Sequence, residues 1–225
     1  IIAASTTSIP EAVGEPRNWD YRYAWVRDGC FCARALTRAG HPAMGARFLA
    51  FLERTIGRGA IQPLYRIDGD PNIPESELPH LRGFADTRPV RIGNAAAGQT
   101  QNDAFGQIVW LAHAVYEAGE PMSADTWNWV ARLVEEADRA ALAPDCGVWE
   151  FRDRPGRYTF SALWCWVALD RGSILAEAVG DERAHVWETR ARALKAQILG
   201  LFAGRGFLAQ SLDADHADAS SLVAA

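Results

Sequence analysis

The chain has 225 residues, of which 49% are hydrophobic and 23% are charged, and this composition is typical of a folded globular chain rather than a disordered one. Its 23 basic and 28 acidic side chains give a formal net charge of −5, so the sequence predicts no basic face for nucleic acid. The longest nearly apolar run, residues 160–169, is far shorter than the roughly 18 residues that suggest a membrane-spanning helix. We therefore expect no nucleic-acid partner and no membrane partner.

Two helices are predicted near the amino-terminal end, after a stretch without helical periodicity. Proline and glycine interrupt residues 1–24, which we expect to be extended. A first helix is predicted over 25–39 and is followed by Gly40. Apolar side chains then recur along one helical face from Met44 to Ile56, which predicts a second helix.

Residues 58–99 break the helical pattern and predict a short β-hairpin excursion. Residues 61–67 and 89–93 have the composition of short strands, and residues 68–72, Asp-Gly-Asp-Pro-Asn, favour a turn. An irregular segment of this length within a helical protein is usually functional or disordered. The aromatic and basic side chains of this segment favour function.

Four further helical patterns follow, and they make the fold all-α with about six helices. Their apolar positions run over 105–116, 127–137, 163–178 and 184–202. Ser123 and Asp181 stand where they could cap the second and the fourth of these helices, and the acidic segment 213–218 could open another. Short connections place neighbouring helices antiparallel, which fits both a helical bundle and an α/α toroid of helical hairpins.

The cysteine pattern and the two ends of the chain bear on cofactors and location. Cys30, Cys32, Cys146 and Cys165 lack the spacing of a zinc site, so we expect reduced, buried side chains and no metal. The sequence has no phosphate-binding loop, and we expect no cofactor. It begins at Ile1 without a targeting segment, which favours a cytoplasmic location, and both ends suggest an internal piece of a larger protein.

The first cluster of side chains that could bind or act on a ligand lies at residues 17–28. It contains four aromatic side chains, three arginines and two aspartates. Neighbouring guanidinium donors and carboxylate acceptors suit the hydroxyl pairs of a sugar, and aromatic rings provide stacking surfaces. The alternative is a structural capping network in which Asp28 starts a helix and Arg27 forms an ion pair.

The second cluster lies at residues 145–152, where Glu150 stands between Trp149 and Phe151. Apolar surroundings disfavour a carboxylate and raise its pKa, which suits a general acid at neutral pH. The alternative is an ordinary surface ion pair between Glu150 and Arg152.

Six stretches, in chain order, then carry a resemblance to a known family. The sequence closely resembles glycoside hydrolase family 15, which holds glucoamylases, glucodextranases and bacterial trehalase-type enzymes. The stretches are Thr6–Glu11, Arg17–Tyr23, Trp25–Asp28, Pro63–Gly69, Arg88–Ala96 and Pro144–Arg152. The resemblance implies that residues 1–225 are part of an (α/α)6 toroid, an incomplete half toroid with its active site in loops at one end.

The resemblance also implies roles for individual residues. Glu150 is implied to be the general acid, and Arg27 and Asp28 are implied to hold the hydroxyls of the terminal glucose. The other implied substrate-binding residues are Tyr21, Trp25, Trp149 and Arg91, with Gln101 and Asp103 as further lining residues of less specific role.

The implied activity is the inverting release of glucose from α-glucan ends, as by a glucoamylase. The alternatives are hydrolysis of trehalose and a catalytically incomplete carbohydrate-binding fragment. An inverting enzyme needs a second carboxyl as its general base, and no acidic residue of this sequence matches the base of the family. We therefore expect this chain to be inactive alone and to depend on the remainder of the catalytic domain, with an α-glucan oligosaccharide or trehalose as substrate.

Overall fold

Six α-helices form the packed part of the chain. The computed structural model describes residues 1–224. The helices are α1 (Val26–Arg38), α2 (Pro42–Ile56), α3 (Asp103–Glu117), α4 (Ala124–Ala140), α5 (Thr159–Val179) and α6 (Ala184–Leu201). Each matches a predicted helix, so the all-α prediction is confirmed.

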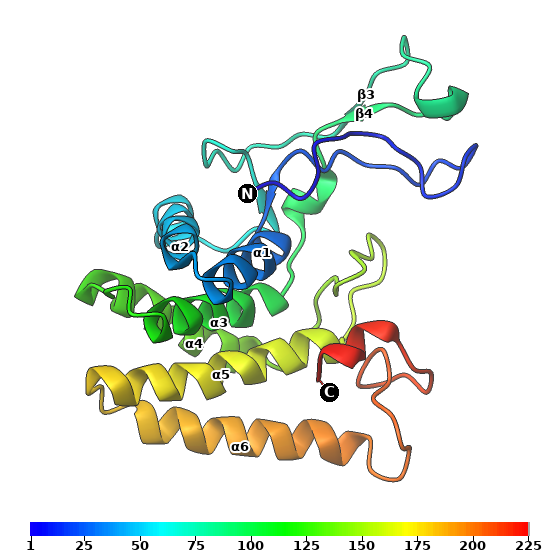
Figure 1. The fold of residues 1–225 in the computed structure, drawn as a ribbon. Coiled ribbons are helices and arrows are strands. Elements are labelled where there is room, and N and C mark those ends of the chain that lie inside the picture. Colours follow the sequence, from blue (N-terminus) through cyan, green and yellow to red (C-terminus); the bar gives the residue numbers. More distant parts are fainter. Residues whose placement is uncertain (225) are drawn as a thin grey trace.

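The helices pair as three successive hairpins, α1 with α2, α3 with α4 and α5 with α6 (Figure 1). Helix α3 packs between α1 and α5, so these three helices form a continuous row. Helices α2, α4 and α6 flank this row. The arrangement is that of part of an (α/α)6 toroid, with odd-numbered helices inside and even-numbered helices outside, and it decides against a simple bundle.

Two helices of the inner row, α3 and α5, are more apolar than the outer helices because they are covered on more than one side. Helix α5 buries residues all around its axis, whereas α6 buries a single stripe that includes Trp187, Leu194 and Ile198. Helices α3 and α5 approach closely at Gly106. A Cβ atom added there would lie 1.9 Å from the carbonyl oxygen of Trp164, so a side chain at this position would force the two helices apart.

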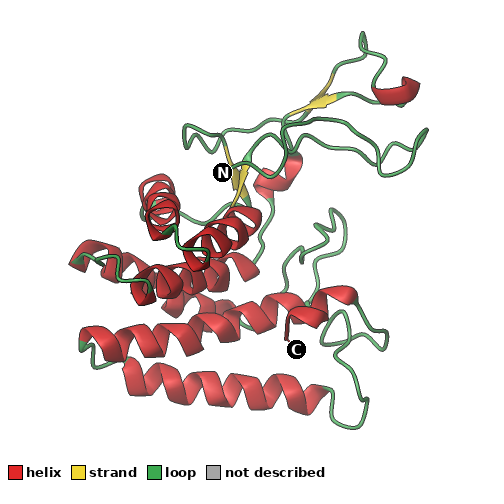
Figure 2. Cartoon of the chain, viewed as in Figure 1, coloured by secondary structure: helices red, strands yellow, loops and turns green. Residues whose placement is uncertain are grey.

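The irregular segments lie together on one side of the helices (Figure 2). The four short strands are β1 (Ala24–Trp25), β2 (Leu64–Tyr65), β3 (Ser76–Glu77) and β4 (Arg91–Ile92). The 3-10 helices are η1 (Phe84–Asp86), η2 (Ala95–Gly98) and η3 (Ala219–Ala224). The extended amino-terminal segment folds back on itself, with an isolated antiparallel bridge between Thr7 and Asp20.

The two predicted strand segments do not pair with each other. Strand β2 pairs antiparallel with β1, directly before α1, and β4 pairs antiparallel with β3. The Val26 N–H extends the first pair by donating to the carbonyl oxygen of Pro63 at 2.9 Å. Residues 58–99 therefore take part in two separate strand pairs, β1 with β2 and β3 with β4. The first pair forms because the chain after α2 returns to the start of α1.

The predicted caps have mixed outcomes. The Ser123 hydroxyl accepts a hydrogen bond from the Thr126 N–H at 3.1 Å, so it caps α4 as predicted. Asp181 does not cap α6, whose N-cap is Arg183, although its carboxylate accepts from the Arg183 N–H at 3.0 Å. Residues 213–218 form no helix, and Asp218 instead accepts from the Ser220 N–H as η3 begins.

The four cysteines are free thiols. Cys30 and Cys165 are buried as predicted, Cys146 is half-buried, and Cys32 is exposed. The prediction is wrong for Cys32 because it lies two positions after Cys30 and so on the opposite face of α1. Within residues 1–224, no three His, Cys, Asp or Glu side chains are grouped as metal ligands. None of the described helices is long and apolar enough to cross a bilayer.

Candidate active site

A cleft of about 770 Å³ opens at the side of the helices that carries the irregular segments. Four separate parts of the sequence line it, namely the amino-terminal segment with the start of α1, the η2 region, the loop between α4 and α5, and the segment after α6. Figure 1 shows this loop and the amino-terminal segment on the same side of the helices. The lining residues are Glu11, Arg17, Trp19, Tyr21, Arg27, Ala96, Val148, Trp149, Glu150, Phe151, Arg152, Asp153 and Gln210.

Arg27, in the first turn of α1, is the centre of a charged cluster beside this cleft. Its Nη2 donates to Glu150 Oε1 at 2.8 Å, and its Nη1 donates to Gln101 Oε1 at 3.0 Å. Asp103 Oδ2 lies 3.7 Å from Nη1, and Asp28 Oδ2 lies 3.9 Å from Nε. One guanidinium therefore faces three carboxyl groups, which leaves the cluster with a surplus of negative charge when all of them are ionised.

The partner of Glu150 rules out the surface ion pair with Arg152 that its sequence motif also allowed. Glu150 pairs with Arg27, whereas Arg152 forms a bidentate pair with Glu75 at 2.9 and 2.8 Å. The Glu150–Arg152 surface pair of the alternative interpretation is thus not formed. Glu150 instead points toward α1 and joins the two sequence clusters into one site.

The backbone of Glu150 adopts a conformation that a residue with a side chain rarely takes. Its φ is +58°, and non-glycine residues in such regions cost on the order of 1–3 kcal/mol, which the surrounding structure must offset. The Gln99 side chain helps to hold it, because its Nε2 donates to the Glu150 carbonyl oxygen at 3.1 Å. Strain of this kind concentrates at functional sites.

Burial raises the pKa of the Glu150 carboxyl above its ordinary value, and the neighbouring Arg27 guanidinium opposes this shift. Asp28 and Asp103 add to the rise because each further negative charge disfavours ionisation of Glu150. Burial likewise raises the pKa of Asp103. A carboxyl whose pKa is raised is better suited to donating a proton, and this one lies at the wall of a cleft.

Of the other predicted site residues, some line the cleft and some lie behind or beside it. Tyr21 lines the cleft, and so does Trp149, whose side chain is 53% exposed and whose Nε1 donates to Asp218 Oδ2 at 2.9 Å. Trp25 is 2% exposed and lies behind Tyr21, with 6.1 Å between the ring centroids. Asp28 lies beside Arg27 but does not line the cleft.

Arg91 lies outside the cleft lining and contacts the amino-terminal segment instead. Its Nη1 donates to the carbonyl oxygens of Asn18 and Pro16 at 2.8 and 3.1 Å. The guanidinium therefore ties this segment to β4. The reason is topological, because β4 pairs with β3 and this pairing turns Arg91 toward residues 16–18.

The cleft also contains residues for which the sequence predicted no role in binding or catalysis. Two guanidinium groups lie near the Trp19 ring, with the Cζ atoms of Arg17 and Arg152 at 5.4 and 5.7 Å from its centroid. Both arginines are fixed by carboxylates, Arg17 by Glu11 and Arg152 by Glu75. The dense aromatic and basic composition of residues 17–28 was the available signal for Trp19, but nothing in it indicated a role for Arg152.

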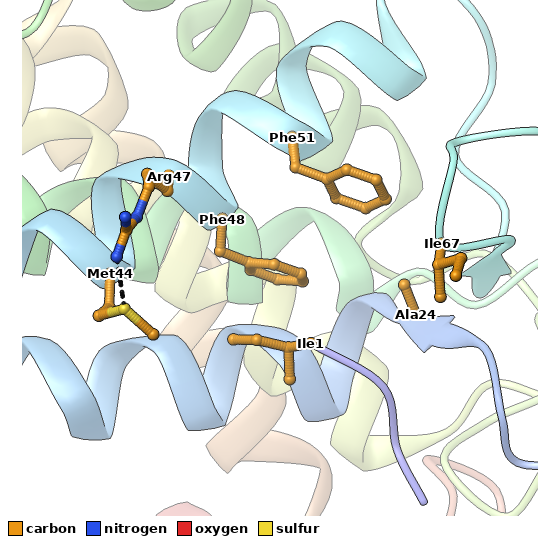
Figure 3. A pocket seen from close by; sticks show the side chains of 7 residues that line it. All are labelled: Ile1, Ala24, Met44, Arg47, Phe48, Phe51 and Ile67. Atoms are coloured by element: carbon orange, nitrogen blue, oxygen red, sulfur yellow. Dashed lines mark hydrogen bonds between the residues drawn. The ribbon is translucent and has the colours of Figure 1, made fainter. Parts of the chain in front are cut away.

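A second hollow, of about 270 Å³, lies against α2 and has a different character (Figure 3). Its lining residues are Ile1, Ala24, Met44, Arg47, Phe48, Phe51 and Ile67. Arg47 turns its Nη2 to the Met44 sulfur at 2.7 Å. The lining contains no carboxyl group, so this hollow lacks the acid that the larger cleft possesses.

The chain is similar to known proteins along its full length. The family model of glycosyl hydrolases family 15 matches residues 1–225. The chain is 40% identical to a protein named trehalase from Mycobacterium tuberculosis, covering 99% of this chain and 34% of that protein. It is 38% identical to a trehalase from Mycolicibacterium smegmatis (100% of this chain, 35% of that protein) and 37% identical to one from Thermoplasma acidophilum (80% and 31%). The chain thus spans about a third of these relatives, and no solved structure matches it.

Proposed function

The chain belongs to glycosyl hydrolases family 15, and on that premise we propose that its cleft takes part in hydrolysis of the α-glucosidic bond of trehalose. The observation that carries this proposal is the half-buried Glu150 carboxyl, which has a raised pKa and lies against Arg27 at the wall of the cleft. The names of the relatives favour trehalose, the alternative of the sequence analysis, over an α-glucan. Trehalose is therefore the first substrate to test.

Glu150 is the proposed general acid. Cleavage of a glucosidic bond creates negative charge on the leaving oxygen, and a carboxylic acid beside that oxygen removes the charge by giving up its proton. Burial favours the protonated form of Glu150. Arg27 then stabilises the carboxylate that remains after the transfer, because its Nη2 already contacts Oε1.

The general base of the proposed inverting reaction must lie on the opposite face of the sugar, with the two carboxyl groups about 6.5–9.5 Å apart. Of the described residues that line the cleft, Glu11 and Asp153 are the other acidic ones, and both are exposed. Glu11 is also paired with Arg17 at 2.8 Å. We propose that the base comes from the remainder of the catalytic domain, which would close the cleft from the other side.

The remaining residues are proposed to bind the sugar. Arg27 would present donors to glucose hydroxyls, and Tyr21 and Trp149 would present ring faces to the apolar faces of the sugar. Asp28 lies beside Arg27 outside the cleft lining, and we propose that it accepts from a sugar hydroxyl at the edge of the site. Trp25 supports Tyr21 from behind, and Arg91 fixes the amino-terminal segment, so both act indirectly.

The test uses the intact protein with trehalose and with maltotriose, and it measures the rate of glucose release. We expect release from trehalose, with β-glucose appearing as the product of attack by water. Glu150→Gln should lower kcat on trehalose by about 10²–10⁴-fold, because the amide cannot donate the proton. Glu182→Gln, the same change at an exposed position, is the control.

A substrate that needs no protonation of its leaving group completes the experiment. Glu150→Gln should lower the rate of glucosyl fluoride hydrolysis much less than it lowers the rate of trehalose hydrolysis. An unchanged trehalose rate in Glu150→Gln would remove Glu150 as the acid. Glucose release from maltotriose but not from trehalose would replace the proposed substrate.

A further inference from the structure

Asp145, which directly precedes the loop of Glu150, is a buried carboxylate with an unusual set of partners. It is 2% exposed. Its Oδ2 accepts from the Asn102 N–H at 2.8 Å and from the Ser161 hydroxyl at 2.6 Å, and its Oδ1 accepts from the Gly147 N–H at 3.0 Å. The three donors come from the N-cap of α3, the first turn of α5 and the loop itself. One side chain thus connects two inner helices to the loop.

The backbone of Asp145 closes the same loop at its base. Asp145 and Gly156 exchange two N–H···O hydrogen bonds of 2.9 Å. The chain between them carries Glu150, in its left-handed conformation, and Gly147, whose φ is +65°. Glu150 holds a backbone conformation that costs free energy, so the loop needs fixed ends to keep it. The side-chain and backbone hydrogen bonds that fix these ends both involve Asp145.

Burying the Asp145 carboxylate lowers the stability of the fold. This cost indicates that the residue has a role besides stabilising the fold. Burial raises the pKa of Asp145 to about 6, against the lowering effect of its hydrogen bonds. With this pKa the group is mostly ionised at pH 7, and an ionised carboxyl accepts from all three donors without presenting a proton of its own to them. An asparagine side chain of the same shape would place its own N–H group opposite at least one of these donors, and that hydrogen bond would be lost.

We propose that Asp145 is a positioning residue that fastens the loop of Glu150 to the first turns of α3 and α5, and so keeps the Glu150 carboxyl against Arg27 and at the leaving oxygen of the substrate. The inference rests on the proposed function, since it takes Glu150 to be the general acid. Asp145 does not line the cleft, so it acts through Glu150 and not on the sugar.

The test is Asp145→Asn in the intact protein, compared on trehalose and on glucosyl fluoride. If Asp145 acts through the acid, kcat on trehalose falls by about tenfold to a hundredfold, a share of the general-acid contribution. Hydrolysis of glucosyl fluoride, whose leaving group needs no proton, falls much less. A role in folding or in sugar binding would lower both rates together, so the ratio of the two rates is the decisive readout.

Two further variants keep the outcome clear. Ser161→Ala removes one of the three donors and should change the same ratio in the same direction, but less, and it carries the test if Asp145→Asn does not fold. Asp181→Asn is the matched control, because Asp181 also accepts a backbone N–H near a helix start and bonds a side chain of another helix, Trp127. It should lower thermal stability and leave the ratio unchanged.

The result that overturns the inference is an equal loss on both substrates, or no loss, in a folded Asp145→Asn or Ser161→Ala protein. Failure of the proposed function is recognised separately, because Glu150→Gln itself would then show no difference between trehalose and glucosyl fluoride. If both proposals hold, adding Asp145→Asn to Glu150→Gln leaves the trehalose rate about where Glu150→Gln alone puts it.

Discussion

Arg27 Nη2 lies 2.8 Å from Glu150 Oε1, and this contact joins residues that are 123 positions apart in the sequence. It connects the first turn of α1 to the loop between α4 and α5. The same guanidinium faces Asp103 and Asp28, so its positive charge is divided among several carboxyl groups. The ionisation of Glu150 therefore depends on residues that do not touch it.

The first prediction concerns Asp103, which is 1% exposed and lies behind Arg27. Asp103→Asn removes a negative charge that raises the pKa of Glu150, so this pKa falls. A general acid is lost as the pH rises through its pKa, and the alkaline limb of kcat/KM on trehalose therefore moves to lower pH. On that limb, activity should fall roughly threefold to tenfold at a fixed pH.

Asp125→Asn is the control for this change, since Asp125 also lies in the first turn of a helix but is exposed and remote from the cleft. It should leave the pH profile in place. A shift of the Asp103→Asn limb to higher pH, or a uniform loss of activity at every pH, would contradict the electrostatic coupling between Asp103 and Glu150.

Local sequence patterns predicted the helices but not the pairing of distant segments. The six helices could be found because their apolar residues recur with the helical period, and Ser123 caps α4 as its position suggests. The partners of β2 and β4 could not be found, since two-residue strands carry almost no periodic signal and depend on where the helices place their ends.

In the candidate site, too, local sequence patterns identified the residues but not the contacts between distant segments. The motifs around Arg27 and Glu150 identified two clusters, and their contact across the cleft is a property of the fold alone. Arg91 belongs to a similar motif, yet β4 directs it to the amino-terminal segment. Trp19 and Arg152 become neighbours because Glu75 holds Arg152 in place, an ion pair between residues 77 positions apart.

A second prediction compares the effect of a Gly→Ala substitution on stability at two helical glycines. Gly106→Ala places a Cβ atom 1.9 Å from the Trp164 carbonyl oxygen, and such overpacking should lower the free energy of unfolding by about 1–3 kcal/mol. Gly200→Ala, in α6, meets no atom within 4 Å. It should raise the free energy of unfolding by roughly 0.5–1 kcal/mol, because alanine favours the helix.

Urea denaturation followed by circular dichroism measures both changes. The opposite signs are the essential point, since both variants add one methyl group to a helical glycine. If Gly106→Ala were as stable as the unchanged protein, the close contact of α3 and α5 would be wrong.

The third prediction is a pH dependence of stability that Asp145 produces. Its pKa rises from 3.8 to about 6 on folding because the group is buried, so between these values the folded chain binds more protons than the unfolded one. Its contribution to the free energy of unfolding is fully present below pH 3.8 and is lost as the pH rises to about 6. The loss is of the order of 3 kcal/mol.

Asp145→Asn cannot titrate, so the difference in unfolding free energy between this variant and the unchanged protein should follow that pH window. Urea denaturation at intervals from pH 4 to pH 7 measures it. A difference that stays constant with pH would show that burial and hydrogen bonding balance at Asp145 and leave its pKa unchanged.

The last prediction concerns Trp149, which stands next to Glu150, is 53% exposed and lines the cleft. A ring face that stacks on the sugar contributes to binding in the ground state and in the transition state alike, so its loss raises KM more than it lowers kcat. Trp149→Ala should therefore raise KM for trehalose roughly threefold to tenfold, which corresponds to about 0.5–1.5 kcal/mol of aromatic contact.

Trp149→Phe separates this stacking from the hydrogen bond between Trp149 Nε1 and Asp218 Oδ2, which spans 2.9 Å. Phenylalanine keeps a flat ring but has no donor, so a stacking role predicts a KM close to that of the unchanged protein. If Trp149→Phe is as impaired as Trp149→Ala, the donor is the important group. Trp149 then holds the loop to the segment before η3, and its effect on kcat should resemble that of Asp145→Asn, because both changes would release the loop on which Glu150 lies.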